Sequence, residues 1–305
     1  MKRGRHMFDF IKNKKDIPIC GGTDRSFDKN APTTILSEDM ILFNVSSVLP
    51  PVEDPDRRQS EPIDYVSAFA VPAGEGTFIF LETYSRYFSE NNYKRCFACV
   101  KENLFPSLVV LTREQNLVSG NGRHSFTHGL PENFGGAIDI RYAGGEKISI
   151  SSNQSPVVSR QTGERIAALF AGAMEGEKVE LPDLAALSEI RFTEEKKNGG
   201  FTRAALSIND DGSGRMTRTR RFSDPKIYNE EKSFGADEIT AVKQNISDCG
   251  MLAWSALPES SYPLGEHKSL TFIFKDGSEI TVPNDRELPN QIHGGFFNIE
   301  LELTK

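Results

Sequence analysis

AIDIRYAGGEKISI, at residues 137–150, and SLTFIFKDGSEITV, at residues 269–282, share one pattern of side chains. Each stretch begins with apolar residues at alternate positions, passes through a glycine and then resumes the alternation. Gly145 of the first stretch aligns with Gly277 of the second. A period of two is typical of a strand with one buried face, and glycine favours tight turns, so each stretch predicts a β-hairpin. The repetition leads to the hypothesis that one module occurs twice in the chain.

The segments upstream follow the same order in both halves. SEDMILFNV, which begins at Ser37, parallels SEIRFTE, which begins at Ser188, and both predict a strand. Residues 64–86 and residues 200–222 each predict a hairpin around a glycine-rich turn. Each module is therefore predicted to contain a strand, a hairpin, a helix, a second hairpin and a closing strand.

One helix is predicted in each module between its two hairpins. SENNYKRCFACVKENLF, at residues 89–105, and GADEITAVKQNI, at residues 235–246, both place apolar residues three and four positions apart. Val100 and the lysine after it align with Val242 and the lysine after it. We therefore expect the two helices to be equivalent.

The ends of the two modules are predicted to differ. A helix is predicted over residues 162–174, and it belongs to the first module alone. The closing strand of the first module is predicted in KVEL, at residues 178–181. That of the second is predicted in FFNIELEL, at residues 296–303, where alternate apolar residues share one face.

These elements predict the α+β class, with two tandem degenerate copies of a module that packs antiparallel hairpins against a helix. The first copy spans residues 35–186 and the second spans residues 187–305. Residues 1–34 are rich in lysine, aspartate and asparagine and have few periodic apolar positions, so they predict a flexible N-terminal tail.

The composition of the chain limits its function classes. Its 305 residues are 37% hydrophobic and 26% charged, which is enough for a sizeable core, and its net charge is −7. This charge argues against general binding to nucleic acid or to an anionic membrane. Asp9 and Lys12 interrupt any secretory signal, and four cysteines are too few for a disulfide scaffold. We therefore expect a cytoplasmic protein of bacterial type.

The first copy is longer than the second in two loops, at residues 50–62 and 112–134. Insertions into a repeated frame are places to look for function, because a loop can change without disturbing the core. The alternative is that both insertions only elaborate the surface. The second insertion contains Arg123, His124 and His128, which are candidate ligand-binding residues.

A zinc site is the sharpest chemical hypothesis. Cys96 and Cys99 have metal-ligand spacing, and together with His124 and His128 they can complete a tetrahedral set. The alternative is that both cysteines are small buried apolar residues of a helix. Since the second copy has other residue types at the aligned positions, we expect no metal or other cofactor to be essential to the fold.

A basic strand is predicted in GRMTRTRRF, at residues 214–222. Alternation places Arg218 and Arg220 on one face, where two guanidinium groups can clamp a phosphate or a carboxylate. The alternative is a charged, solvated edge of the sheet, which many proteins use to prevent aggregation.

The motifs that the sequence lacks favour a binding protein. It contains no nucleophile elbow, phosphate-binding loop, zinc-protease motif or dinucleotide fingerprint. We therefore expect a non-enzymatic binding or interaction protein, whose partner is a protein or a small anionic ligand. One alternative is an enzyme, such as a metal-assisted hydrolase, that uses Arg123, His124 and His128. Another is an anion binder that uses Arg218 and Arg220.

Overall fold

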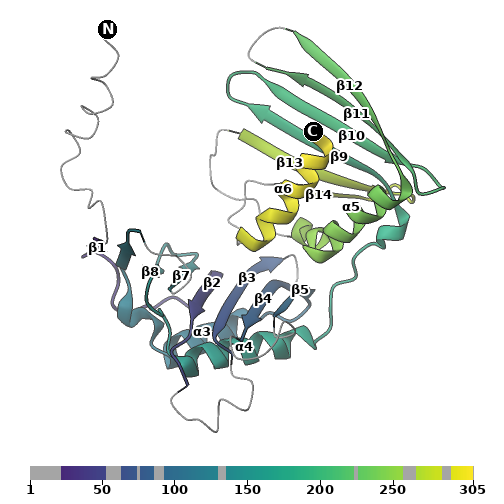
Figure 1. Ribbon diagram of the computed structural model, residues 1–305. Coiled ribbons are helices and arrows are strands. Elements are labelled where there is room, and N and C mark those ends of the chain that lie inside the picture. Colours follow the sequence, from purple (N-terminus) through teal and green to yellow (C-terminus); the bar gives the residue numbers. More distant parts are fainter. Residues whose placement is uncertain are drawn as a thin grey trace, which may run out of the picture. The chain divides into compact units, whose positions relative to one another are not determined.

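The computed structural model describes residues 22–52, 63–73, 76–85, 93–129, 135–222, 226–256, 266–283 and 290–304. Within these residues the chain forms two sheets, mostly antiparallel, and four α-helices (Figure 1), in agreement with the predicted α+β class. Contacts group the chain into two compact units, formed by residues 1–69, 81–96 and 105–171 and by residues 70–80, 97–104 and 172–305.

The first sheet has eight strands. In spatial order they are β1 (Thr23–Phe27), β6 (Arg123–Thr127), β8 (Lys147–Ser152), β7 (Gly136–Tyr142), β2 (Met40–Val48), β3 (Tyr65–Ala73), β4 (Gly76–Tyr84) and β5 (Lys94–Val100). Strands β6 and β8 pair in parallel, whereas β1 with β6, β2 with β7, and β7 with β8 pair antiparallel. Helices α3 (Phe105–Glu114) and α4 (Arg160–Met174) cover one face of this sheet (Figure 1).

The helix-covered face of the first sheet holds its core. Phe43 and Val45 of β2 lie on the same face as Ile138 and Ile140 of β7, and all four side chains are buried. The rings of Phe43 and Phe170 of α4 are 5.8 Å apart between centroids. Because successive side chains of a strand point to opposite faces, the residues between these apolar ones are directed away from the helices.

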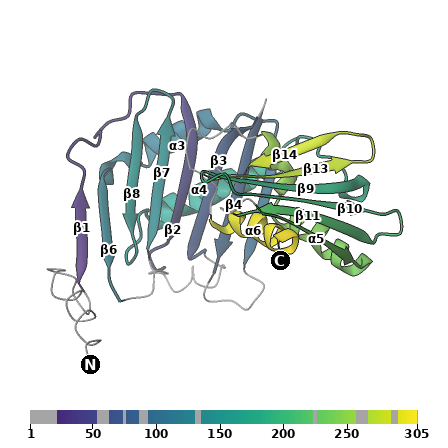
Figure 2. The ribbon, with the colours of Figure 1, turned by 90° about the horizontal axis from the view of Figure 1, so that it is seen from above.

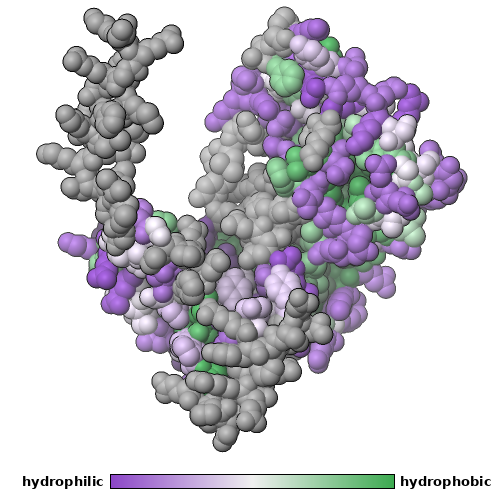
Figure 3. Space-filling view, viewed as in Figure 1, coloured by the Kyte–Doolittle hydropathy of each residue, from purple (hydrophilic) through white to green (hydrophobic). Residues whose placement is uncertain are grey.

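The second sheet has six strands. Their order is β12 (Ile227–Phe234), β11 (Gly214–Arg221), β10 (Phe201–Ile208), β9 (Leu187–Lys196), β13 (Glu266–Phe274) and β14 (Glu279–Pro283). Helices α5 (Ala236–Asp248) and α6 (Asn290–Thr304) lie along one face of this sheet (Figures 1 and 2). Phe192, Leu206, Phe272 and Phe296 are buried there. The surface over β10, β11 and β12 is mainly hydrophilic (Figure 3).

Six strands of the first sheet follow the same order as the six strands of the second. The run β8-β7-β2-β3-β4-β5 corresponds to β14-β13-β9-β10-β11-β12. Along the chain, α3 follows β5 as α5 follows β12, and α4 follows β8 as α6 follows β14. Strands β1 and β6 stand outside this correspondence and extend the first sheet at one edge.

The two stretches with matching patterns both form hairpins with the same turn. The N–H of Gly145 donates to the carbonyl of Tyr142 at 2.9 Å, and the N–H of Gly277 donates to that of Phe274 at 2.9 Å. The two glycines have φ values of 86° and 84°, in the left-handed region. The predicted hairpins β7–β8 and β13–β14 are therefore confirmed.

The predicted helix over residues 89–105 is wrong. Its described part contains β5, and α3 begins only at Phe105. The signal for this boundary is Pro106, because proline lacks an N–H donor and suits the first turn of a helix but not its interior. The alignment of Val100 with Val242 consequently pairs a strand residue with a residue of α5.

The predicted closing strand at residues 296–303 is also wrong, because these residues belong to α6. Phe296, Ile299 and Leu303 are buried at spacings of three and four, whereas Phe297 is 55% exposed. In a sequence this apolar, both periods fit the same residues, so the pattern alone did not distinguish a helix from a strand.

Two further predictions, for the segment before the predicted first copy and for its end, differ from the structure. Residues Thr23–Phe27, which fall within the predicted flexible tail, form β1 and pair with β6 along their whole length. Residues 1–21 lie outside the described residues. The predicted strand at residues 178–181 is reduced to a short pairing, in which the N–H of Val179 donates to the carbonyl of Cys99 at 2.8 Å.

The shared turn predicts a matched effect of two substitutions. Gly145→Ala and Gly277→Ala are each expected to lower the free energy of unfolding by about 1 kcal/mol, because alanine is strained at positive φ. An added Cβ meets no atom within 4 Å at either position, so the cost is one of conformation alone. Gly144→Ala is the control, since its Cβ also meets open space and its φ is not positive. Urea unfolding measures all three, and an equal loss in Gly144→Ala would contradict this account.

Candidate functional site

A row of small side chains crosses five strands of the first sheet on the face opposite α3 and α4. The strand registers place Ser26 beside His124, His124 beside Ser151, and Ser151 beside Ala137. Ala137 in turn lies beside Ser46 of β2. Small side chains leave room above the strands, so this row forms the floor of a depression.

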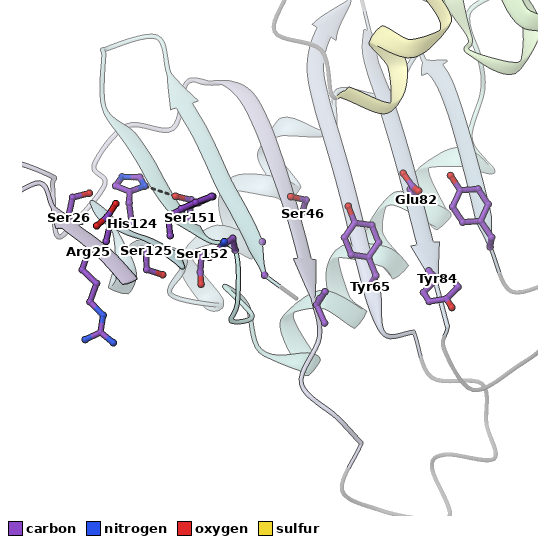
Figure 4. A pocket seen from close by; sticks show the side chains of 17 residues that line it. Arg25, Ser26, Ser46, Tyr65, Glu82, Tyr84, His124, Ser125, Ser151 and Ser152 are labelled. Atoms are coloured by element: carbon purple, nitrogen blue, oxygen red, sulfur yellow. Dashed lines mark hydrogen bonds between the residues drawn. The ribbon is translucent and has the colours of Figure 1, made fainter. Parts of the chain in front are cut away.

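The depression is a hollow of about 1000 Å³ on the open face of the first sheet (Figure 4). Strands β1, β6 and β8 build one end of it and carry the polar groups Ser26, His124 and Ser151. The other end combines a carboxylate with aromatic rings from β3, β4 and the start of β5, namely Tyr65, Glu82, Tyr84 and Tyr93. Ser46 lies between the two ends in Figure 4.

His124 is held at the polar end by a serine. Its Nδ1 lies 2.9 Å from Ser151 Oγ (Figure 4). Among the described residues, no carboxylate hydrogen-bonds the other ring nitrogen of His124. Serine hydrolases require a third group that orients the histidine, so this pair lacks part of the usual nucleophilic arrangement.

Arg123 and His128 do not join His124 at the hollow. His128 Nε2 lies 2.7 Å from Asp24 Oδ2 on β1, and its ring packs edge-on against Phe126. Arg123 does not line the hollow but lines an adjoining, smaller cavity of about 530 Å³, which shares His124 and Ser151 with it. The hypothesis that the two histidines face one pocket therefore finds no support in this geometry.

The structure does not bring the four residues of the predicted zinc site together. Cys96 and Cys99 lie on β5, and His124 and His128 lie on or just after β6. Five strands separate β5 from β6 in the sheet, which is roughly 29 Å at about 4.8 Å per strand. Within the part of the chain that the structure describes, no three His, Cys, Asp or Glu residues are grouped to hold a metal ion. Cys99 is buried instead, and burial raises the pKa of its thiol.

Glu82 is the most unusual residue of the aromatic end. It is only 7% exposed, and its Oε1 lies 3.7 Å from Arg95 Nη2 of β5. Its Oε2 is buried and has no hydrogen-bond partner among the residues that the structure describes. A buried acceptor left without a donor costs about 1–3 kcal/mol, so a ligand that supplies the donor regains that energy. The sequence signal for Glu82 is a single acidic residue within the apolar strand TFIFLETY, which belongs to no motif.

Tyr93 lies beside this carboxylate. Burial, together with the hydrogen bond and negative charge of Glu82, raises the pKa of Tyr93 to about 12. The guanidinium of Arg95 lies over the Tyr93 ring, 5.3 Å from its centroid. The Tyr93 hydroxyl therefore remains protonated at neutral pH and donates its hydrogen bond to Glu82.

Arg218 and Arg220 of β11 are already engaged by an internal carboxylate. Arg218 is only 3% exposed and pairs with Oε2 of Glu230 on β12. Arg220 Nη2 lies 2.5 Å from Oε1 of the same Glu230. Arg218 is therefore neither a solvated residue at the edge of the sheet nor part of an open anion clamp, because its charge is buried against Glu230.

No protein-family model matches the chain, and a search of curated proteins finds no significant match. Among the described residues, no helix is long and apolar enough to cross a membrane. Any functional conclusion therefore depends on the geometry of the hollow.

The first prediction for the site concerns the titration of Tyr93. Glu82→Gln is expected to lower the pKa of Tyr93 from about 12 towards the ordinary value of 10, because it removes the negative charge that opposes ionisation. Since the folded-state pKa lies above the unfolded one, Tyr93 stabilises the fold below about pH 10, and this contribution is lost between about pH 10 and 12. NMR titration of ring-labelled tyrosines measures the shift. Tyr142, whose pKa is raised chiefly by burial, serves as the internal control and should not change.

The second prediction concerns the arginine pair. The Arg218 hydrogen bond holds the pKa of Glu230 below its usual range, against an opposing effect of burial. Glu230 therefore stabilises the fold above about pH 4.5, and this contribution is lost as the pH falls through its lowered pKa. In urea unfolding, the free energy of unfolding of Glu230→Gln should fall less between pH 6 and pH 3 than that of the wild type. Glu231→Gln, which removes only an exposed pair with Arg215, should keep the wild-type slope, and identical slopes for both variants would refute the assignment.

Proposed function

We propose that this chain is a non-enzymatic binding protein, built from two copies of an α+β module, whose ligand site is the hollow of the first copy. The observation that carries this proposal is the construction of one end of the hollow by β1 and β6. These are the strands that lie outside the correspondence between the sheets. A feature that is added to one copy of a repeated frame, and that builds part of a hollow, is where a binding site is expected.

The duplication is supported by details that strand patterns alone do not require. Six strands and two helices follow in the same order in each half of the chain. The turns at Gly145 and Gly277 repeat the same hydrogen bond and the same left-handed conformation. A common origin of the two halves explains the order and the turns together.

The size and lining of the hollow support binding. Ligand sites occupy about 300–1000 Å³ and combine an apolar lining with a few placed polar groups. Here the hollow lies at the upper end of that range, with aromatic rings at one end and hydroxyl and imidazole groups at the other. Its floor is paired sheet, which presents side chains in fixed positions.

Two alternative functions have weaker support. The contact between His124 and Ser151 favours a hydrolytic enzyme, and Arg123 lines the smaller cavity beside it, but His128 lies away from this contact and pairs with Asp24. An anion site at Arg218 and Arg220 would have to displace Glu230. The cytoplasmic location and the bacterial type of the protein remain predictions from the sequence.

Filling the hollow tests the proposed function. Ser46→Trp places a large side chain on its floor, while Thr193→Trp places one on the corresponding face of β9, the equivalent central strand of the second sheet. The chain with ring-labelled tyrosines is screened by NMR against amino-acid amides, dipeptides, nucleosides and sugars. At least one compound class should shift Tyr65, Tyr84 or Tyr93 saturably in the wild type and in Thr193→Trp. Binding should fall at least tenfold in Ser46→Trp.

Two results would overturn this proposal. One is a panel in which no compound shifts these tyrosines. The other is binding that persists unchanged in Ser46→Trp, because the ligand would then lie elsewhere. Circular dichroism of both tryptophan variants establishes that each retains its fold.

A further inference from the structure

We infer that the aromatic end of the hollow binds an organic cation, an ammonium or guanidinium group, through Oε2 of Glu82. This inference rests on the proposed function, because it names the chemistry of one end of the same site. It is carried by a different observation, the buried carboxylate oxygen that has no hydrogen-bond partner.

The two oxygens of Glu82 differ in their surroundings. Oε1 faces Arg95 Nη2 at 3.7 Å, which is an ion pair but longer than a hydrogen bond. The Tyr93 hydroxyl hydrogen-bonds this carboxylate, but among the described residues Oε2 itself has no hydrogen-bond partner, although Glu82 is more than nine-tenths buried and lines the hollow. A carboxylate accepts several hydrogen bonds, so Arg95 leaves room for a second basic group.

Two other buried or half-buried carboxylates of this chain each lie near two basic groups, one at each oxygen. Glu230 pairs with Arg218 through Oε2 and with Arg220 through Oε1. Glu194 is as buried as Glu82, and its Oε1 lies 3.3 Å from Lys268 Nζ while its Oε2 lies 3.6 Å from Lys196 Nζ. Glu82 resembles these two residues with one of the two cations absent.

The tyrosines around Glu82 suit a cation better than a neutral or anionic group. Aromatic faces attract ammonium and guanidinium groups within about 6 Å of the ring centroid. Arg95 already lies in this position over Tyr93, 5.3 Å from the centroid. Tyr65 and Tyr84 present two more rings beside Glu82 in Figure 4. An anion would instead meet the negative carboxylate and the negative faces of the rings.

The test compares a cation with its uncharged counterpart on the full chain. Butylguanidinium and butylurea have nearly the same shape, but only the first is charged. Each is titrated into protein with ring-labelled tyrosines, and the shifts of Tyr65, Tyr84 and Tyr93 give the dissociation constant. Butylguanidinium should bind at least tenfold more tightly than butylurea. Butylammonium should share this preference, because both cations donate to a carboxylate.

Variants separate the role of Glu82 from a general effect of charge. Glu82→Gln should weaken butylguanidinium binding at least tenfold. Asp139→Asn is the matched control, because Asp139 lies on the same face of the sheet, outside the hollow, and pairs with Arg141. Arg95→Gln should strengthen binding, since it removes the competing cation. If Glu82→Gln fails to fold, Tyr84→Ala gives a second measurement at a residue that is 43% exposed, and a severalfold loss of affinity is expected.

The source of the cation is distinguished by a further titration with the peptide acetyl-Gly-Arg-Gly-amide. A peptide that binds more tightly than butylguanidinium places the cation on a protein side chain, with the backbone along the floor of the hollow. Equal affinity places it on a small molecule. Either result requires the same loss in Glu82→Gln.

Equal binding of butylguanidinium and butylurea would overturn the inference, as would unchanged binding in Glu82→Gln. If other compounds bind the hollow in a manner that Ser46→Trp abolishes, the proposed function stands while the cation inference fails. If no compound, charged or neutral, shifts the three tyrosines, both fail.

Discussion

The structure depends on one constraint, that a strand directs alternate side chains to opposite faces of its sheet. In each sheet one set of residues packs beneath two helices, as Phe43 does against Phe170 in the first. The other set of side chains then lies on the second face of the sheet and must be compatible with the surroundings there. In the first sheet this set includes Ser26, Ser46 and Ser151, whose small side chains leave a hollow above the strands. The burial of the core and the site are thus two results of the same backbone geometry.

A second feature of the structure is that carboxylates are buried beside basic groups. Glu194 and Glu230 each have a basic group of the chain near both oxygens. Lys268, a partner of Glu194, shows the effect of such pairing on the basic group. Burial alone would lower the pKa of Lys268, but its hydrogen bond to Glu300 and the charges of Glu300 and Glu194 outweigh this effect and raise it. Glu82 differs from Glu194 and Glu230, because its Oε2 is buried without a donor among the described residues. A buried acceptor for which the chain supplies no donor is typical of a binding site, where the ligand supplies the donor instead.

Local signals predicted the hairpins well and the helices unevenly. Alternating apolar residues around Gly145 and Gly277 correctly predicted two hairpins, because turn chemistry acts over a few residues. The same reasoning failed at β5 and α6, where apolar residues are dense enough to satisfy both a period of two and a period of 3.6. Hydrogen bonding determined which conformation each of these two segments adopts. β5 joins the edge of a sheet, whereas α6 follows a complete hairpin and packs across β10 and β11.

By itself, the sequence determined the α+β class and the hairpins around Gly145 and Gly277, because these follow from local periodicity and turn chemistry. Only the tertiary structure decided which residues meet. The strand order separated the cysteines of β5 from the histidines near β6, and it brought Glu82 to the same hollow as His124 although 42 positions separate them in the chain. The physical reason is that sheet pairing is non-local. Neighbours across a sheet are chosen by hydrogen bonding and burial over the whole domain, and no short stretch of residues contains that information.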